Sequence, residues 1–357
     1  MTEIDTGPAE LLPRVALGET GLELTRIGFG AAPLGNLYAP VEESRSDQLL
    51  AALIESPIRY FDTAPFYGFG LSERRLGDAL RALPRATFAL STKVGRLIKP
   101  LPGHAGFAVR QGYATPMPFE PVYDYSYDAI MRSYEDSQQR LGLAEIDLLY
   151  VHDIGRLTHG DANDAHFRML AESGYRALEE LRASGAVKAV GLGVNEYEIC
   201  EQAMETGQFD CFMLAGRYSL LEQEPLASFF PKCEAHGARI VAAGVYNSGI
   251  LATGVKGDGP HYYNYEPAPA EIIQKTARIE KLCEVHGVSL PAAAMQFVLA
   301  HPIVVSACIG FGKAARVDKT LELYHAAIPD RFWSDLKGEG LIDADAPTPV
   351  SKEAHEP

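Results

Sequence analysis

The sequence predicts a (β/α)8 barrel, a closed ring of parallel strands in which each strand is followed by a helix. Eight short apolar runs alternate with stretches whose apolar residues recur at helical spacing, from Thr25 to Ala327. Three successive runs end in a polar side chain, which is where barrels carry their chemistry. No G-x-G-x-x-G turn follows the first run, so a doubly wound dinucleotide-binding sheet, which would also alternate, lacks support.

The length, composition and net charge of the chain predict one soluble domain. The 357 residues show no linker, internal repeat or low-complexity tract, so residues 1–357 are predicted to form a single barrel domain, with flexible tails at 1–12 and 343–357. The apolar fraction of 47% and the charged fraction of 22% are typical of a globular protein. A net charge of −15 argues against nucleic acid or an anionic membrane as a partner. The sequence does not determine the oligomeric state, and both a monomer and a homo-oligomer are compatible with it.

The predicted location is the cytoplasm. No apolar run approaches the ~20 residues that span a bilayer, and Met1 to Glu10 lacks the basic and apolar regions of a signal peptide. The odd number of cysteines and the absence of a CxxC or Cys/His cluster predict reduced core residues and no metal site. These cysteines are Cys200, Cys211, Cys233, Cys283 and Cys308.

The first part of the chain begins with a predicted hairpin at Arg14–Leu24, built around a Gly-Glu-Thr-Gly turn. A first core strand follows at Thr25–Gly30, and Ser44–Ser56 has the apolar spacing of a helix. The next strand ends at Asp62. Ser72 is then expected to cap a helix that runs to Leu83.

The middle of the chain departs from this rhythm once. After the strand ending at Lys93, the segment Gly95–Tyr123 is rich in proline and glycine and is predicted to be an irregular, substrate-facing loop. Ser126 begins a strong helix, and the following strand ends at His152. The helix at Arg168–Ser184 meets a natural stop in the glycine that follows it.

The second half continues the alternation through four more strands. A second loop rich in glycine, proline and tyrosine, Gly244–Pro269, is expected to face the substrate as well. The predicted strands are Val187–Gly193, Cys211–Leu214, Arg239–Ala243 and Val304–Ile309, and the predicted helices are Glu196–Thr206, Pro225–His236, Ala270–His286, Leu290–His301 and Ala314–Ala327.

Four polar side chains are expected to converge where the strands end. Asp62, Lys93 and His152 each end a strand, and Tyr67 lies on the loop that follows the first of them. A phenol has a pKa near ~10, and a neighbouring ammonium such as that of Lys93 lowers it. A carboxylate such as that of Asp62 would hold this ammonium in place and keep it charged. With a histidine to orient the substrate oxygen, the set suits proton transfer to a carbonyl or from an alcohol. Such chemistry needs a hydride carrier, because no side chain accepts hydride.

These segments resemble the signatures of the aldo-keto reductases. The resemblance extends over about Gly28 to Ala327, and it implies a barrel that binds NAD or NADP without a Rossmann domain. It also implies that Asp62, Tyr67, Lys93 and His152 form the catalytic tetrad. The matching segments are Phe61–Gly68, Ser72–Glu73, Leu76–Gly77, Ser91–Lys93 and Tyr150–His152.

A closer likeness points to one subgroup. Several segments resemble sugar 1-dehydrogenases, which act on L-fucose or D-threo-aldoses, and pyridoxal 4-dehydrogenases. Both oxidise a cyclic hemiacetal to a lactone. The segments are Asp124–Asp128, Met131–Ser133, Glu135–Ser137, Arg140–Gly142 and Leu214–Leu221.

The cofactor residues that the resemblance implies match the family pattern less well. Asn195 stands one position from the usual carboxamide-binding asparagine, Ala215 replaces a usual glutamine, and Tyr246 is a loop substitute for an aromatic residue that stacks on nicotinamide. Near the last strand, Arg316 is implied to contact a 2′-phosphate or adenine, with Thr320 at a usual asparagine position. The whole set is Gly30, Asn195, Tyr218, Tyr246, Gly310, Gly312, Lys313, Arg316 and Thr320; it leaves the choice between NAD and NADP open.

The expected activity is oxidation of a hemiacetal, with Tyr67 taking the hydroxyl proton. Polar contacts to this small-molecule substrate, a sugar or an aldehyde, are predicted for Tyr38, Arg96, Tyr125 and Asp153. A general aldehyde or ketone reductase of the same fold is an alternative, since the same residues run the reverse reaction. A cofactor-sensing subunit without turnover is a second alternative. A metal-dependent hydrolase is disfavoured, because no H-x-H pair ends a strand.

Overall fold

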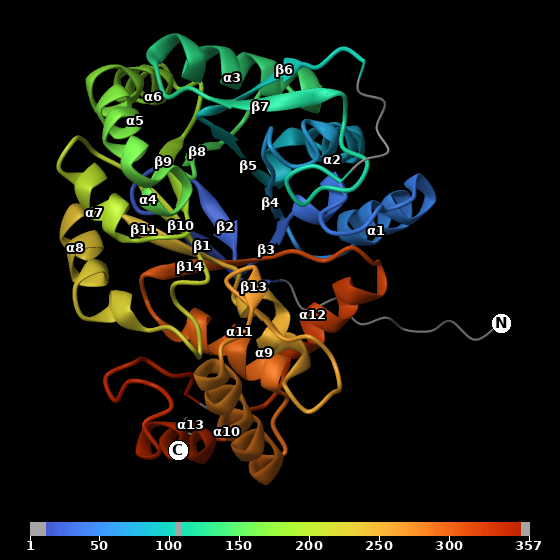
Figure 1. Cartoon of the computed structure of the whole chain (residues 1–357), viewed down its shortest axis with the longest axis vertical. Helices are drawn as coiled ribbons and strands as arrows, with labels where there is room; N and C mark the ends of the chain where they lie inside the picture. Colours follow the sequence, from blue (N-terminus) through green and yellow to red (C-terminus); the bar gives the residue numbers. More distant parts are fainter. Residues whose placement is uncertain (1–11, 104–108, 351–357) are drawn as a thin grey trace.

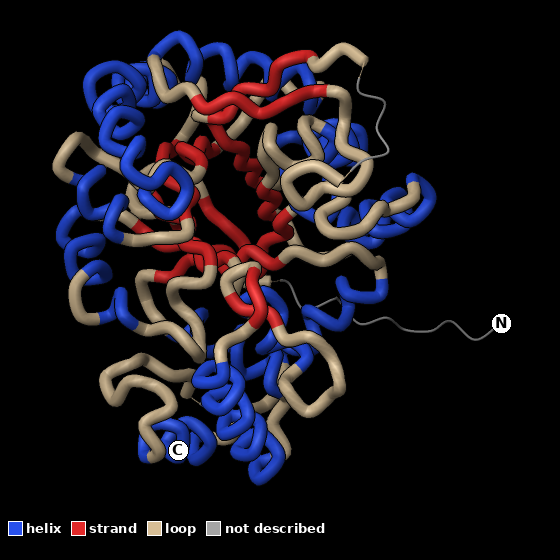
Figure 2. Tube along the Cα trace, viewed as in Figure 1, coloured by secondary structure: helices blue, strands red, loops and turns tan. Residues whose placement is uncertain are grey.

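Eight parallel strands close into a barrel in the computed structural model, which describes residues 12–103 and 109–350. Consecutive strands are neighbours around the ring, and the last pairs with the first through Ala307 and Ile27, so the predicted barrel is confirmed. Figure 2 shows this ring with helices on its outside. The strands are β3 (Ile27–Gly30), β4 (Tyr60–Asp62), β5 (Ala89–Val94), β8 (Leu148–His152), β9 (Ala189–Val194), β10 (Cys211–Ala215), β11 (Arg239–Ala243) and β14 (Val304–Ile309).

Helices follow each strand and cover the barrel (Figure 1). Most bury one apolar face, whereas α11 is apolar almost all round and lies in the core between its neighbours. Helix α3 begins directly after Ser126, as predicted, and the Ser126 side chain caps it by accepting a hydrogen bond from Ala129 N. The helices are α1 (Glu43–Glu55), α2 (Leu71–Leu80), α3 (Tyr127–Leu141), α4 (Arg156–His159), α5 (Asn163–Met169), α6 (Tyr175–Ala183), α7 (Glu198–Met204), α8 (Phe229–His236), α9 (Ile250–Thr253), α10 (Ala270–His286), α11 (Leu290–Ala300), α12 (Ala315–His325) and α13 (Asp330–Gly338).

The N-terminal hairpin plugs one end of the barrel. Strands β1 (Arg14–Ala16) and β2 (Glu23–Thr25) pair antiparallel. Leu17, Leu22 and Leu24 are buried in one apolar cluster with residues at the amino ends of the barrel strands. The site must therefore lie at the other, carboxyl end of the strands.

One predicted helix start is wrong. Helix α2 begins at Leu71, after Gly70, and the Ser72 side chain does not cap it. The Ser72 hydroxyl instead donates to Ala31 O at 2.7 Å, because the residue is buried between α2 and the loop after β3.

The two long loops contain more structure than predicted. Within Gly95–Tyr123, strands β6 (Arg96–Pro100) and β7 (Phe119–Tyr123) form an antiparallel hairpin over α3. Within Gly244–Pro269, the helix α9 is followed by a small hairpin of β12 (Tyr262–Tyr263) and β13 (Glu266–Pro267).

The C-terminal segment is partly packed. After α13, which the sequence did not predict, Ala346 is completely buried and Asp343 N donates to the side chain of Gln223 at 3.0 Å. This part of the expected tail is therefore attached to the barrel, while residues 1–11 and 351–357 lie outside the described residues. The five cysteines are buried and unpaired, as predicted. Across the described part of the chain, no single helix has the length and apolar character to cross a membrane; the bent pair α10–α11 meets that test only jointly.

Candidate active site

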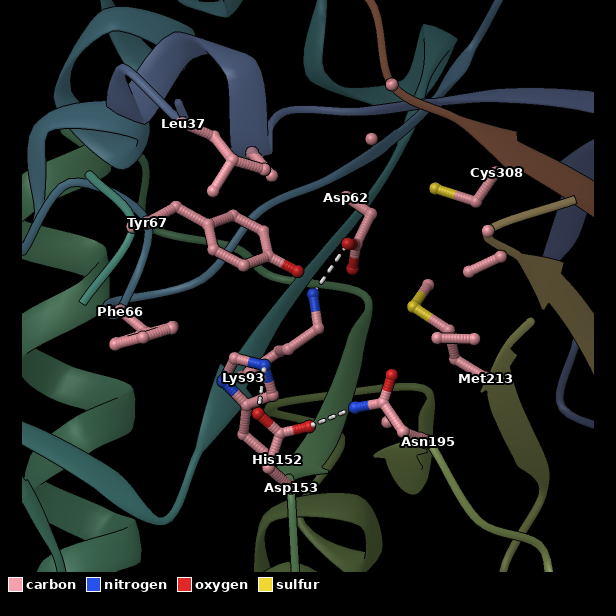
Figure 3. Close-up of a pocket in the computed structure, with 18 of the residues that line it drawn as sticks. Leu37, Asp62, Phe66, Tyr67, Lys93, His152, Asp153, Asn195, Met213 and Cys308 are labelled. Carbon is pink, nitrogen blue, oxygen red and sulfur yellow. Dashed lines mark hydrogen bonds and ion pairs between the residues drawn. The ribbon is translucent and has the colours of Figure 1, made fainter. Parts of the chain in front are cut away.

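The structure brings Asp62, Tyr67, Lys93 and His152 to one cavity of about 460 Å³ at the carboxyl end of the barrel (Figure 3). Three of them sit at the ends of the neighbouring strands β4, β5 and β8, and the fourth lies on the loop after β4. Their roles in a reaction remain predictions.

Lys93 and Asp62 form a buried ion pair. Lys93 Nζ lies 2.6 Å from Asp62 Oδ2 and also donates to Thr63 O at 2.9 Å. The other carboxylate oxygen of Asp62 accepts from Ser91 Oγ at 2.7 Å. Because two charges leave water here, these extra hydrogen bonds are needed to offset their desolvation, and they hold the ammonium in one place.

Tyr67 is positioned by a contact between two glycine backbones. A Cβ on Gly35 would lie 2.5 Å from the carbonyl carbon of Tyr67, and one on Gly68 would lie 2.5 Å from Gly35 O. Gly68 also has φ +64°, which side chains rarely adopt. The turn aims the phenol oxygen at Lys93 Nζ (Figure 3), which lies 4.7 Å from the centre of the Tyr67 ring.

The expected acidification of Tyr67 by Lys93 is not found. The pKa of Tyr67 is raised well above 10, first by burial and then by the charges of Asp62 and Asp153. Tyr67 in this structure is therefore a neutral phenol, which is a proton donor at neutral pH.

His152 is a neutral imidazole in the cavity wall. Its pKa is lowered well below 6.5, first by burial and then by the positive charges of Arg96 and Lys93. Its ring centre lies 5.8 Å from that of Tyr67, and Nε2 lies 3.5 Å from Asp153 Oδ2. The buried Nδ1 has no hydrogen-bond partner in the described chain.

The cavity has room for a flat ring with an amide group. Beside the tetrad its wall is made of small residues, Gly193, Ala215, Ala243 and Gly244 among them. Asn195 Nδ2 donates to Asp153 Oδ1 at 3.2 Å, so its own amide oxygen is left for another donor. These features fit a nicotinamide carboxamide.

Two further predicted cofactor residues belong to the cavity wall. Gly30 and Gly310 both line the cavity. A Cβ on Gly310 would lie only 3.2 Å from Gly30 O, so the two backbones approach closely and expose their polar groups. Gly312 and Lys313 follow, and Arg316 lies in the first turn of α12. Tyr246 lies near Arg316, whose charge opposes the rise that burial causes in the pKa of Tyr246.

Six of the nine predicted cofactor residues do not line the cavity: Tyr218, Tyr246, Gly312, Lys313, Arg316 and Thr320. Two of these, Tyr218 and Thr320, face the core. Tyr218 is 1% exposed and packs on Phe230 and Phe297, with ring centres 5.0 and 5.3 Å away. Thr320 is buried, and its hydroxyl donates to Arg316 O at 2.7 Å. Both assignments are corrected, because each side chain faces the core.

The four predicted substrate contacts also fall into two groups, those that line the cavity and those that do not. Tyr38 and Asp153 line the cavity, whereas Arg96 and Tyr125 do not. Arg96 lies between the rings of Phe66 and Tyr123, 4.0 and 4.7 Å from their centres, and pairs with Asp153. Tyr125 is fully buried, and its hydroxyl donates to His152 O at 2.9 Å. Both residues support the wall from behind.

Several wall residues were not predicted. Tyr113 and Tyr265 belong to the two long loops. Both loops were predicted to face the substrate, but neither tyrosine was named as a contact. Met213 and Cys308 project inward from β10 and β14, and only the strand register shows which face they occupy. The cavity wall also includes Ala32, Leu37, Phe66, Gln111, Gly112 and Val194.

Comparisons with known proteins agree with this geometry. Residues 26–338 match the model of the aldo/keto reductase family. The chain is 48% identical to a pyridoxal 4-dehydrogenase of Microbacterium luteolum (92% of this chain, 97% of the relative) and 38% identical to a D-threo-aldose 1-dehydrogenase of a Pseudomonas species (94% and 98%). Its fold superposes on the holo form of an aldo-keto reductase from Bacillus halodurans with a TM-score of 0.71 at 23% identity, covering 97% of this chain and all of that one. The chain belongs to the aldo/keto reductase family.

Proposed function

We propose that this protein, an oxidoreductase of its family, oxidises the hydroxyl of a cyclic hemiacetal to a lactone. An aldose such as L-fucose and the hemiacetal form of pyridoxal are the substrates in view. Two relatives, at 48% and 38% identity, are dehydrogenases of pyridoxal and of D-threo-aldoses. The observation that carries the proposal is the meeting of Tyr67, Lys93 and His152 in one cavity beside Asn195.

The family's nicotinamide cofactor supplies the hydride acceptor when it is bound. Asn195 would hold its carboxamide, and the backbone N–H groups near Gly30 and Gly310 would bind its phosphates. NAD is used at least as well as NADP, because Arg316 stands without the Lys/Ser pair that the family usually places beside a 2′-phosphate.

Tyr67 and His152 act on the reacting oxygen. Tyr67 exchanges a proton with it, while His152, which is neutral, donates or accepts a hydrogen bond and fixes its position. Asp62 keeps Lys93 in place beside the phenol, and Lys93 stabilises the negative charge that the phenol oxygen carries once its proton is lost.

Reduction of an aldehyde is a second candidate, and the raised pKa of Tyr67 favours it. A neutral phenol is ready to donate a proton to a developing alkoxide. The same residues then work in the opposite direction.

A substrate panel separates the two candidates. L-fucose, other aldoses, pyridoxal and aromatic aldehydes are tested with both NAD and NADP, and the reduced cofactor is followed by its absorbance. Oxidation of an aldose or pyridoxal with kcat/KM at least tenfold above that for reduction of the aromatic aldehydes supports the first candidate. Reduction of the aldehydes without oxidation of any hemiacetal supports the second.

A further inference from the structure

Asp153 occupies an unusual place beside the tetrad. It directly follows His152 at the end of β8, and its side chain lines the cavity. Its backbone has φ +46°, a left-handed conformation that Asn and Asp adopt more readily than other side chains. A hydrogen bond from Asp153 N to Gly193 O, at 2.9 Å, fixes this turn. The carboxylate is therefore held at the cavity by its backbone.

Two neighbours, Arg96 and Asn195, bind the carboxylate and leave part of it unpaired. Arg96 pairs with Oδ2, Asn195 donates to Oδ1 at 3.2 Å, and His152 Nε2 lies 3.5 Å from Oδ2. Arg96 cannot easily move, because the rings of Phe66 and Tyr123 enclose its guanidinium. An ionised carboxylate has about four acceptor positions, so at least one remains for a donor in the cavity.

A second aspartate on the same strand segment shows what a purely structural ion pair looks like here. Asp147 lies just before β8, at the opposite end of the strand. Its carboxylate is occupied by Arg85, by Lys188 at 2.9 Å and by Leu90 N at 2.9 Å, and it does not line the cavity. The Asp153 side chain, in contrast, is 14% exposed, and that exposure is toward the cavity. Ion pairing alone does not require this position.

We propose that Asp153 determines substrate specificity by accepting a hydrogen bond from a hydroxyl on the carbon next to the reacting carbon. This deepens the proposed function for its aldose substrates, which carry such a hydroxyl, and rests on the assignment of Tyr67 and His152 to the reacting oxygen. Because Asp153 is adjacent to His152, an oxygen held by His152 leaves the neighbouring substituent of the substrate close to the carboxylate. The site then selects hydroxylated substrates over plain aldehydes, since an analogue without the hydroxyl leaves a buried acceptor unpaired.

Matched substrate pairs test this role. Glycolaldehyde and acetaldehyde differ only in the hydroxyl next to the reacting carbon and are compared in the reductive direction. An aldose and its 2-deoxy form are compared in the oxidative direction. Asp153→Gly tolerates the positive φ and removes the carboxylate, and Asp153→Asn keeps the shape and one acceptor oxygen while removing the charge.

The ratio of kcat/KM within each pair is the readout. In Asp153→Gly we expect the preference for the hydroxylated member to fall roughly 10- to 100-fold, with a smaller fall of at least threefold in Asp153→Asn. Asp147→Asn is the matched control, which loses stability but keeps the ratio. Ratios within threefold of wild type in Asp153→Gly, or an equal loss on both members, would overturn the proposal. The aldehyde pair reports on Asp153 even if no hemiacetal is oxidised, so the two proposals fail separately.

Discussion

The ammonium of Lys93 lies 2.6 Å from Asp62 Oδ2, and both side chains are at most 3% exposed. A buried charge that loses its partner is strongly destabilising, at about 3–5 kcal/mol. We therefore expect Asp62→Ala to lower the free energy of unfolding by that amount and to reduce kcat at least 100-fold, because Lys93 is no longer held beside Tyr67. Urea unfolding and steady-state turnover measure the two effects. Full activity in a destabilised Asp62→Ala variant would show that the pair serves the fold alone.

Tyr67→Phe removes the proton donor and little else. We expect turnover to fall about 10²- to 10⁴-fold, as for the loss of a general acid or base, while cofactor affinity and melting temperature stay near wild type. Turnover is measured at saturating substrate, and cofactor affinity by fluorescence titration. Turnover within tenfold of wild type would refute the assigned role.

The raised pKa of Tyr67 predicts opposite pH behaviour in the two directions. Oxidation needs the phenolate, whose fraction grows about tenfold per pH unit below the pKa, so kcat/KM for oxidation should climb without a plateau up to about pH 10. Reduction uses the neutral phenol and should be level over the neutral range. Profiles of kcat/KM from pH 6 to 10, measured for oxidation and for reduction, check both expectations. A plateau in the oxidation profile that begins near pH 7 would contradict the prediction.

The lowered pKa of His152 predicts a stability loss in acid. Below about pH 6.5 the unfolded chain binds a proton at this histidine while the folded chain does not. The free energy of unfolding should therefore fall by up to about 1.4 kcal/mol per pH unit as the pH decreases from 6.5. Urea unfolding at pH 7 and pH 5 tests this in wild type and His152→Gln. The variant should lose less stability between the two pH values, and an equal loss would exclude His152 as the source.

Gly35→Ala tests how Tyr67 is positioned. The added methyl would collide with the backbone of Tyr67 and Gly68, so we expect kcat to fall at least tenfold as the phenol shifts, with the barrel still folded. Gly338→Ala is the control, because nothing lies within 4 Å of its added methyl. Circular dichroism confirms folding and turnover gives the effect. Equal activity of the two variants would show that the loop adjusts without moving Tyr67.

The sequence was sufficient to predict the barrel and the tetrad because both follow from local patterns. Apolar runs mark strands, and the carboxyl ends of parallel strands share one edge, so Asp62, Lys93 and His152 had to meet. The raised pKa of Tyr67 was not predictable, because it is set first by the burial of the phenol and then by the nearby carboxylates, which depend on the folded structure.

The errors arose where side-chain direction depends on distant contacts. Arg96 follows Gly95, whose φ of +93° turns the chain into β6, and the side chain then lies behind the wall rather than in it. The β6–β7 hairpin pairs residues that are distant along the chain, from Arg96 with Tyr123 to Pro100 with Phe119, across a segment rich in proline and glycine, so its strand pattern is weak locally. Tyr218 and Thr320 were assigned by their position along the chain, which does not say which face of an element a side chain occupies.

The hairpin formed by β1 and β2 determines where substrate enters the barrel and where product leaves it. Since Leu17, Leu22 and Leu24 close the barrel floor, reactant and spent product share the same opening at the opposite end. Product must therefore leave the cavity before the next substrate molecule can enter. We expect a high product concentration to inhibit turnover, because bound product blocks the opening through which substrate enters.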